Sequence, residues 1–264
     1  MFPVEFVAFV MIGIVAGFVA GLMGISGGMV IVPCLAFAFY VLGMPDAYRM
    51  HVVIGTAFAA MVFGTFVSSH THRKHGRVLF HVVKPMTCGL IVGAVIGACI
   101  VRVLSGRVLR ILFGTLELVV GGRFLLSVKE MKRHASLPSR GISALMATFV
   151  GILSTVLGIG GGLINVPLLL YLGVPTKQAI GTASLLGFVT CVLATCSLLI
   201  AGWGSVSYPH VVGWIHIPAC IGVGMGAACS APAGAGMTAH LPARVLHKVF
   251  GSLLLAAGLM LIAG

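Results

Sequence analysis

Acidic residues are the scarcest feature of this 264-residue chain. It has only four of them, Glu5, Asp46, Glu117 and Glu130, against sixteen lysines and arginines, and charged residues make up 8% of the sequence. A soluble domain carries about 25% charged residues, so a surface that faces water on all sides is excluded. Asp46 is the only aspartate, which excludes a catalytic aspartate pair. So few carboxylates also fit poorly with a carrier of metal cations.

Other chemical signatures are missing as well. No two of the seven cysteines have the CxxC spacing, and all lie in apolar segments, so they are interpreted as small buried residues. The loop at 70–77 holds His70, His72 and His75 among basic residues, which indicates a solvated loop rather than a metal site. No P-loop is present, so ATP-driven pumping is not expected. We expect no metal and no cofactor.

Apolar sequence is what the chain has in abundance, at 59% hydrophobic residues. About 20 apolar residues span a bilayer, so the long apolar runs predict an all-α polytopic membrane protein. The net charge of +12 does not indicate nucleic acid, because the basic residues lie between the apolar runs, as the positive-inside rule expects. The predicted segments lie at 6–44, 52–69, 82–101, 108–127, 141–176, 178–201, 210–233 and 245–263.

Two of these runs contain the same glycine-rich motif. GLMGISGGMVIVP covers residues 21–33, and TVLGIGGGLINVP covers residues 155–167. Glycine weakens a helix and proline removes a backbone donor, so each run is expected to be broken. The first run then forms either two short spans or one helix followed by a re-entrant one. Helix breaks at membrane depth are tolerated where they line a cavity, and transporters build substrate sites from them.

Three further blocks recur in the same order along the chain. We therefore predict two homologous repeats, residues 1–127 and 141–264, joined by a basic loop at 128–140. The recurring blocks are LGMP at 42–45 and LGVP at 172–175, IGTA at 54–57 and 180–183, and the segments 107–114 and 244–251.

Loop charge favours opposite orientations for the two repeats. The loops at 70–77 and 129–140 are basic, so both are expected in the cytoplasm. The loop equivalent to 70–77 in the second repeat, 202–205, carries no charge, whereas the next loop, at 244–248, is basic. Corresponding loops therefore change sides, which is typical of inverted repeats. Three arginines contradict this topology, because it places them outside: Arg102, Arg107 and Arg110.

The duplicated glycine motifs, the paired prolines and the recurring blocks together resemble the TauE/SafE (TSUP) family of sulfite exporters, over essentially the whole chain. The resemblance implies secondary transport, with export expected, of a small sulfur-containing anion: sulfite, sulfate, thiosulfate or an organosulfonate. The expected partners are a small inorganic or organic anion, protons and the lipid bilayer of the cell membrane, without nucleic acid. An anion channel or a metabolite permease is the alternative.

The candidate site follows from what an anion needs when it loses water. Helix N-termini offer free backbone N–H groups and partial positive charge, glycines let backbone approach a ligand, and short polar side chains complete the shell. The competing interpretation is that small residues let helices pack closely. The predicted substrate-binding residues are Gly24, Ser26, Gly27, Gly28, Gly158, Gly160, Gly161, Gly162, Asn165, Thr56, Thr182 and Ser184.

Two ionisable residues in apolar surroundings are candidates for proton coupling, Glu117 and His216. The alternatives are an ion pair of Glu117 with Arg110 or Arg123, and an ordinary buried histidine whose hydrogen bonds are satisfied. Each alternative leaves the residue with a structural role only.

An intramembrane serine protease is the enzymatic alternative. Residues 24–27 spell GxSG, the serine-loop pattern of rhomboid proteases, and His216 would serve as the base. However, the second copy of the motif has Gly160 where the first has Ser26. The shared feature is therefore backbone shape rather than a nucleophile, and we expect no catalytic residues and no enzyme.

Overall fold

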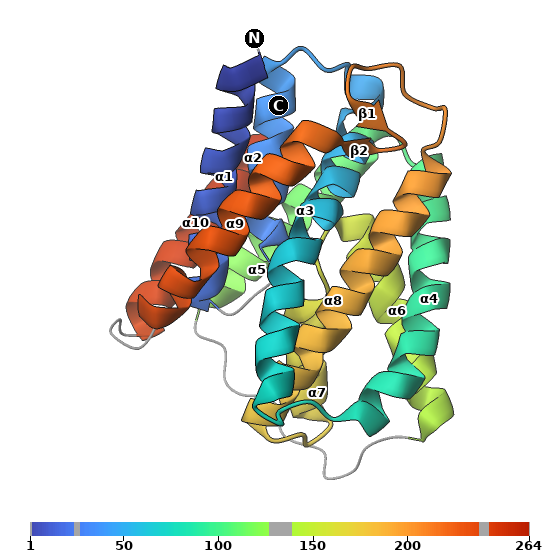
Figure 1. The fold of residues 1–264 in the computed structure, drawn as a ribbon, viewed down its shortest axis with the longest axis vertical. Coiled ribbons are helices and arrows are strands. Elements are labelled where there is room, and N and C mark those ends of the chain that lie inside the picture. The colour runs from blue at the N-terminus through green and yellow to red at the C-terminus, as the bar shows by residue number, and fades with distance from the viewer. Residues whose placement is uncertain (1, 24–26, 127–138, 238–242, 264) are drawn as a thin grey trace.

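The computed structural model describes residues 2–23, 27–126, 139–237 and 243–263, and these are almost entirely helical (Figure 1). This confirms the predicted all-α fold. The elements are α1 (Phe2–Met23), α2 (Gly28–Val41), α3 (Asp46–Lys74), α4 (Phe80–Val103), α5 (Gly106–Leu125), α6 (Arg140–Leu157), α7 (Gly162–Tyr171), α8 (Thr176–Ala201), β1 (Val211–Val212), β2 (Ile215–His216), α9 (Ile217–Met237) and α10 (Ala243–Ala263).

Several helices are suited to a lipid environment. Within the described ranges, α1, α3, α4, α6, α8 and α9 are long and apolar enough to cross a membrane. Their outer faces carry large apolar side chains in the open: Val4 is 76% exposed, Phe149 60% and Ile200 73%. Apolar surface of this extent is not stable in water, so it is the surface that contacts lipid.

Both predicted glycine breaks are present. The chain leaves α1 at Met23 and enters α2 at Gly28, and it leaves α6 at Leu157 and enters α7 at Gly162. α2 has 14 residues and α7 has 10, which gives lengths of about 21 and 15 Å. The hydrocarbon core is about 30 Å thick. Of the two alternatives for the first run, one spanning helix followed by a shorter helix is therefore the one observed.

Two predicted boundaries are wrong. α3 continues to Lys74, past the predicted start of a loop at residue 70, because no glycine or proline lies between Gly64 and Gly76. The predicted span at 210–233 begins instead with an antiparallel hairpin, in which Val211 pairs with His216. Gly213, at a φ of 60°, supplies the turn, and α9 starts only after the hairpin.

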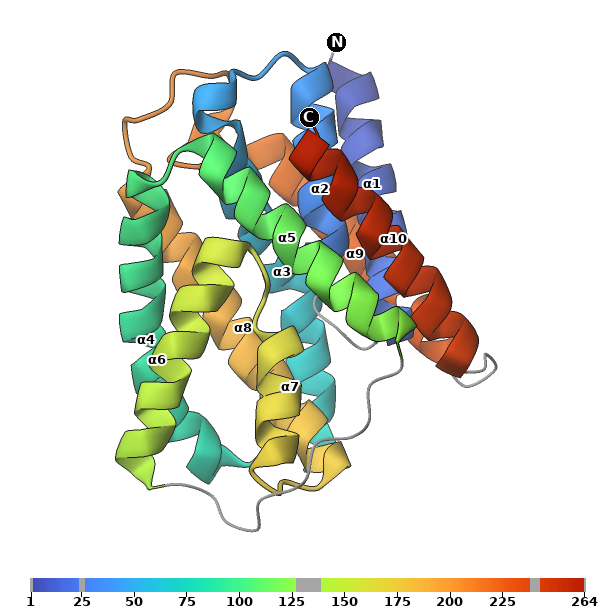
Figure 2. The same cartoon turned by 180° about the vertical axis from the view of Figure 1, so that it is seen from behind.

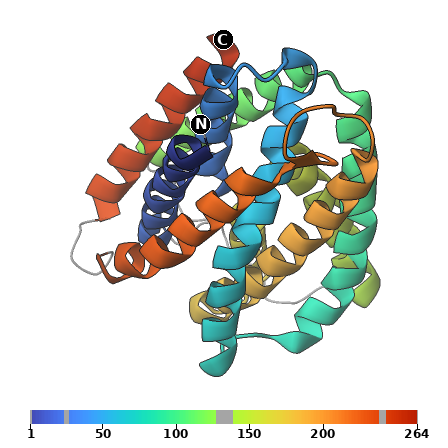
Figure 3. The same cartoon turned by 45° about the horizontal axis from the view of Figure 1, so that its top comes forward.

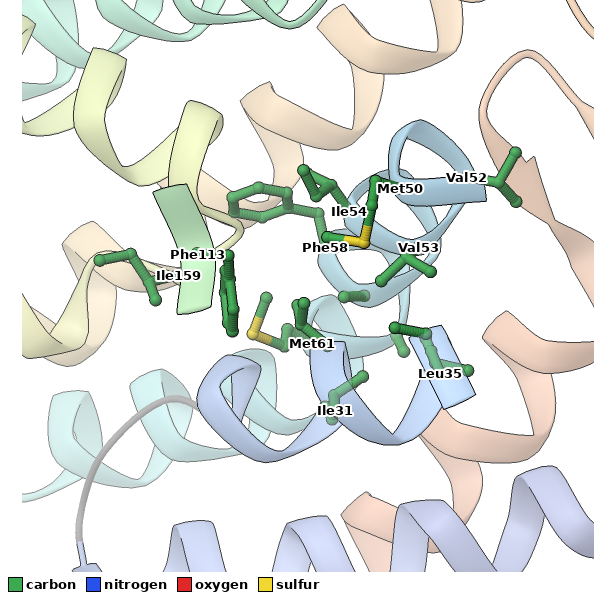
Figure 4. Packing of buried hydrophobic residues seen from close by; sticks show 14 of the residues in the cluster. Ile31, Leu35, Met50, Val52, Val53, Ile54, Phe58, Met61, Phe113 and Ile159 are labelled. Carbon is green, nitrogen blue, oxygen red and sulfur yellow. The ribbon is translucent and has the colours of Figure 1, made fainter. Parts of the chain in front are cut away.

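α3 is the central helix of the molecule. Residues 50–61 are buried without interruption, which is typical of a helix that is covered on all sides. Ile31 of α2, Phe113 of α5 and Ile159 of the second glycine break belong to the same buried cluster around it (Figure 4). This shared core therefore packs both glycine breaks against α3.

Helices of the first half pack on helices of the second half. α1 lies along α9, α4 along α6, α5 along α10, and α3 along α8. The outer pairs α4–α6 and α5–α10 are visible from behind (Figure 2), and α1 beside α9 is clearest with the top tilted forward (Figure 3). The segments 1–127 and 141–264 are consequently interleaved rather than separate compact units.

Equivalent threonines make equivalent contacts in the two halves. Thr56 of α3 accepts a hydrogen bond from the backbone N–H of His216, at 2.9 Å, just before α9. Thr182 of α8 accepts one from the backbone N–H of Leu79, at 3.0 Å, just before α4. The glycine before each threonine leaves no room for a Cβ, because the backbone of the same incoming segment touches it. We propose an inverted duplication of the chain, which these paired contacts support.

Replacing Thr56 by valine is expected to lower the free energy of unfolding by about 1–3 kcal/mol, because it leaves the buried N–H of His216 without an acceptor. Thr195→Val is the matched control, since the Thr195 hydroxyl donates to the Cys191 carbonyl of its own helix, at 2.6 Å, and does not bridge to another described element. Thermal unfolding in detergent measures both changes. Equal losses in the two variants would contradict a bracing role for the bond between Thr56 and the hairpin.

Candidate functional site

A cavity of about 520 Å³ lies among α1, α3, α8 and α9, where the N-terminal ends of α2 and α7 also reach it. Its volume is within the range of small-molecule sites, about 300–1,000 Å³. We call it the central cavity. Besides aliphatic side chains and Pro232, it is lined by Gly17, Gly21, Gly27, Gly64, Thr65, Ser68, Thr71, His72, Gly160, Gly162, Ser184 and Gly187.

The two glycine breaks meet beside this cavity. Gly27 is the N-cap of α2 and Gly161 that of α7, and neither helix has a side-chain hydrogen bond at its cap. A Cβ atom at Gly28 would lie 2.6 Å from the carbonyl oxygen of Gly158, so the backbones of the two breaks are in contact. The first N–H groups of a helix have no intrahelical partner and carry partial positive charge. The arrangement therefore places two helix N-termini beside one cavity.

The second break depends on glycine for its shape. Gly158 ends α6 at a φ of 64°, and Gly161 precedes α7 at a φ of 74°. Side chains with a Cβ rarely adopt such left-handed conformations. A reversal this tight brings α7 back toward the side from which α6 came, as Figure 2 shows, and leaves the start of α7 inside the protein.

The structure brings part of the predicted glycine set together at the cavity. Gly27, Gly160, Gly162 and Ser184 line it, while Gly28, Gly158 and Gly161 shape the breaks next to it. Gly24 and Ser26 lie outside the described residues. For them, and for the rhomboid-like GxSG pattern, substrate contact stays a prediction from the sequence.

Asn165 is the polar side chain of the second break. It is completely buried, and neither atom of its amide has a hydrogen-bond partner among the described residues. Its Nδ2 and the Oγ1 of Thr190 both approach Gly161, at 3.0 and 3.2 Å from the position a Cβ would take there. A buried amide without partners is costly, and Asn165 is not among the residues that line the central cavity. Thr190 was not predicted.

Thr56 and Thr182 have other partners. Each hydroxyl oxygen accepts a backbone N–H across the interface between the halves, and neither residue lines the central cavity. These contacts match the alternative interpretation, in which small residues serve helix packing. A role of these two threonines in substrate binding stays untested.

One polar face of α3 was missed by the sequence interpretation. Thr65, Ser68, Thr71 and His72 line the cavity, and Ser68 shares a hydrogen bond with Ser184 of α8 at 2.8 Å. Spacings of three, four and seven residues place side chains on one helix face. This periodicity was readable in the sequence. The predicted solvated loop at 70–77 obscures it, because His72 belongs to α3.

Glu117 is fully buried in α5, and neither carboxylate oxygen has a hydrogen-bond partner in the described part of the chain. The predicted alternative of an ion pair with Arg110 or Arg123 is not formed there, where the one ion pair joins Arg49 to Asp46. Glu117 does not line the central cavity. A carboxylate in such surroundings is expensive to charge, so its presence calls for a function.

The side chain of His216 caps a helix and packs against aromatic rings. Its Nδ1 accepts a hydrogen bond from the backbone N–H of Ala219, at 3.2 Å, and so caps the start of α9. Its ring packs against Phe9 and Phe39, with centroids 5.5 and 5.3 Å away. These contacts are those of a buried histidine that caps a helix. A role in proton coupling stays a prediction. Among the described residues, no three His, Cys, Asp or Glu side chains gather around a possible metal position.

Comparison with known proteins identifies the family of the chain. The family described as "Sulfite exporter TauE/SafE" matches residues 9–261. A probable membrane transporter protein of Haemophilus influenzae is 29% identical over 94% of this chain and 95% of its own length. The probable membrane transporter protein YunE of Bacillus subtilis is 25% identical over 98% and 97%. No solved structure matches. The chain therefore belongs to the TauE/SafE sulfite exporter family and is a multi-pass membrane transporter of the cell membrane.

Proposed function

We propose that this transporter exports a small sulfur-containing anion by secondary transport, and that the anion binds in the central cavity between the two glycine breaks. The observation that carries this proposal is that both glycine breaks reach the central cavity: Gly27, the N-cap of α2, and Gly162, the first residue of α7, line it. Beside the cavity the two breaks touch at Gly28 and Gly158. Two helix N-termini facing one small space form an anion site from backbone alone, without a charged side chain.

The lining of the cavity favours an anion over a cation. The described residues that line it include no aspartate or glutamate, and carboxylates are the usual ligands of metal cations in a carrier. The groups present are glycine backbone, hydroxyl groups on α3 and α8, and the imidazole of His72. Thr65 and Thr71 donate their hydroxyl protons to carbonyls of α3. The donors left for an anion are therefore the backbone N–H groups of the breaks and the second proton of the Ser68–Ser184 pair. Such donors replace the water that an anion sheds on entering a membrane protein. The unpartnered amide of Asn165 lies behind this lining, beside Gly161 of the second break.

Glu117 supports coupling of transport to protons in this proposal. Its carboxyl is buried beside α10, with its Cβ 3.2 Å from the position a Cβ at Gly258 would take. It has no ionic partner among the described residues. Isolated ionisable groups inside membrane proteins are typical of proton relays. A proton gradient then supplies the energy that ATP does not.

Flux measurements in proteoliposomes test the proposal. Purified protein is reconstituted, and movement of sulfite, sulfate, thiosulfate and sulfoacetate is followed with and without a pH gradient. We expect saturable flux of at least one of these anions, increased by the gradient. Liposomes without protein, and liposomes with the Gly28→Leu variant, are the controls for leak.

Two outcomes would contradict the proposal in different ways. Flux that neither saturates nor responds to the gradient indicates an anion channel. An absence of flux for all four anions, with correctly inserted protein, shows that the substrate belongs to another chemical class.

A further inference from the structure

A second cavity, of about 540 Å³, lies at the end of the molecule where α2 ends, α3 and α5 begin and α10 ends. These ends lie together at the top of Figure 2. We call this second cavity the arginine pocket. Its lining includes Phe37, Tyr40, Arg49, Arg107, Arg110 and Met260.

The arginine pocket is separated from the central cavity by α2. Ile31 of this helix lines the central cavity, while Tyr40 lines the arginine pocket. Nine residues of an α-helix make two and a half turns, so these two side chains point in roughly opposite directions. The arginine pocket therefore lies off the proposed transport site, and a ligand there has a separate role.

Two of the three arginines in the pocket have no compensating charge. Arg49 forms an ion pair with Asp46 at 2.5 Å and donates twice to the Met44 carbonyl, at 2.6 and 2.9 Å. Arg107 and Arg110 form no ion pair with any residue that the structure describes. The Nε of Arg110 is also buried without a hydrogen-bond partner there. The pocket thus holds two positive charges available for an external anion.

The outer wall of the pocket is apolar and open. Phe37 is 51% exposed, Tyr40 64% and Met260 48%. On the outside of a membrane protein, exposed apolar and aromatic side chains such as these are suited to contact lipid. A free inorganic anion uses only the arginines, whereas a phospholipid uses both parts of the site. Its phosphate meets the guanidinium groups, which match phosphate geometry, and its acyl chain lies along the apolar wall.

We propose that the arginine pocket binds the head group of an anionic phospholipid, such as phosphatidylglycerol, through Arg107 and Arg110. The lipid thereby bridges α5 to α2 and α10. This assignment also gives a reason for the arginines that contradict the predicted topology. Arg107 and Arg110 are held on that side by a lipid contact and are not signals for orientation.

Lipid titration of the full-length protein in detergent tests the assignment. Phosphatidylglycerol and phosphatidylcholine with the same acyl chains are compared by native mass spectrometry, which counts bound lipids. We expect phosphatidylglycerol to bind the wild type, and the Arg107→Gln/Arg110→Gln double variant to bind it about tenfold more weakly, because each arginine contributes attraction for the anionic head. Arg102→Gln is the matched control: this arginine is exposed near the same end, on α4, outside the pocket, and its loss should leave binding unchanged.

Three results would overturn the assignment. They are equal phosphatidylglycerol affinity in the double variant and the wild type, equal binding of phosphatidylcholine, and displacement of the lipid by glycerol phosphate at concentrations similar to the lipid's own. The last result would show a site for a free anion. If the double variant does not elute as a monodisperse species, Arg107→Gln alone must weaken binding, since Arg107 is exposed and its loss leaves the core intact. None of these readouts depends on transport.

Discussion

Leucine in place of Gly28 is expected to reduce anion flux by about a hundredfold while the protein still inserts into the membrane. A Cβ at this position would lie 2.6 Å from the backbone oxygen of Gly158 and 3.1 Å from the sulfur of Met61. The sulfur can move, but the carbonyl belongs to the second break and cannot. The two breaks must therefore separate, and misplacing binding groups by about 1 Å can cost this much in rate. Flux in proteoliposomes measures the loss.

The same experiment needs controls that separate a site effect from a loss of fold. Gly122→Leu, also in a helix, has no atom within 4 Å of its added Cβ and should transport normally. Gly64→Ala, which lines the central cavity with open space around its added Cβ, should retain most flux. Gly162→Leu, at the start of α7, should lose it. If both Gly28→Leu and Gly162→Leu transport at the wild-type rate, the anion does not bind between the breaks.

The helix breaks and their positions were predictable because glycine and proline act on the local chain. Residues 21–33 and 155–167 weaken any helix that contains them, whatever surrounds it. The apolar runs likewise fix the number and order of most helices. The contact between Gly28 and Gly158, in contrast, depends on how the two halves fit together. No feature of either motif alone specifies this contact.

The hairpin at 211–216 shows a second limit. Its residues are nearly as apolar as those of a membrane-spanning helix. The hydropathy pattern therefore predicts a spanning segment that begins at residue 210. The decisive signals were the turn at Gly213 and the proline at position 218, which is favoured near the start of a helix. The hydrogen bond from His216 to Thr56 joins residues 160 positions apart. Such a bond becomes visible only in three dimensions, and it gives Thr56 a structural contact that its sequence pattern does not predict.

The second large effect is expected at Glu117. Glu117→Gln should abolish the stimulation of flux by a pH gradient, reducing gradient-driven accumulation at least about tenfold, a typical size for the loss of a proton-transfer group. Glutamine has nearly the same volume and cannot exchange a proton. Exchange of labelled anion between equal concentrations on both sides should continue, because it requires no net movement of protons. Measuring both fluxes in the same proteoliposomes separates loss of coupling from loss of transport.

The matched control for this change is Glu5→Gln, which removes a carboxylate from the first turn of α1 and should leave coupling intact. Glu117→Leu is a sharper test, because the equivalent position of the second half is Leu254, which is equally buried. Leucine there should fold, since replacing an unpaired buried charge by an apolar residue is often neutral or stabilising, and it should be uncoupled like glutamine. If either variant at position 117 still responds fully to the gradient, the proton moves through another group. The buried carboxyl of α5 would then have a structural role, despite having no partner among the described residues.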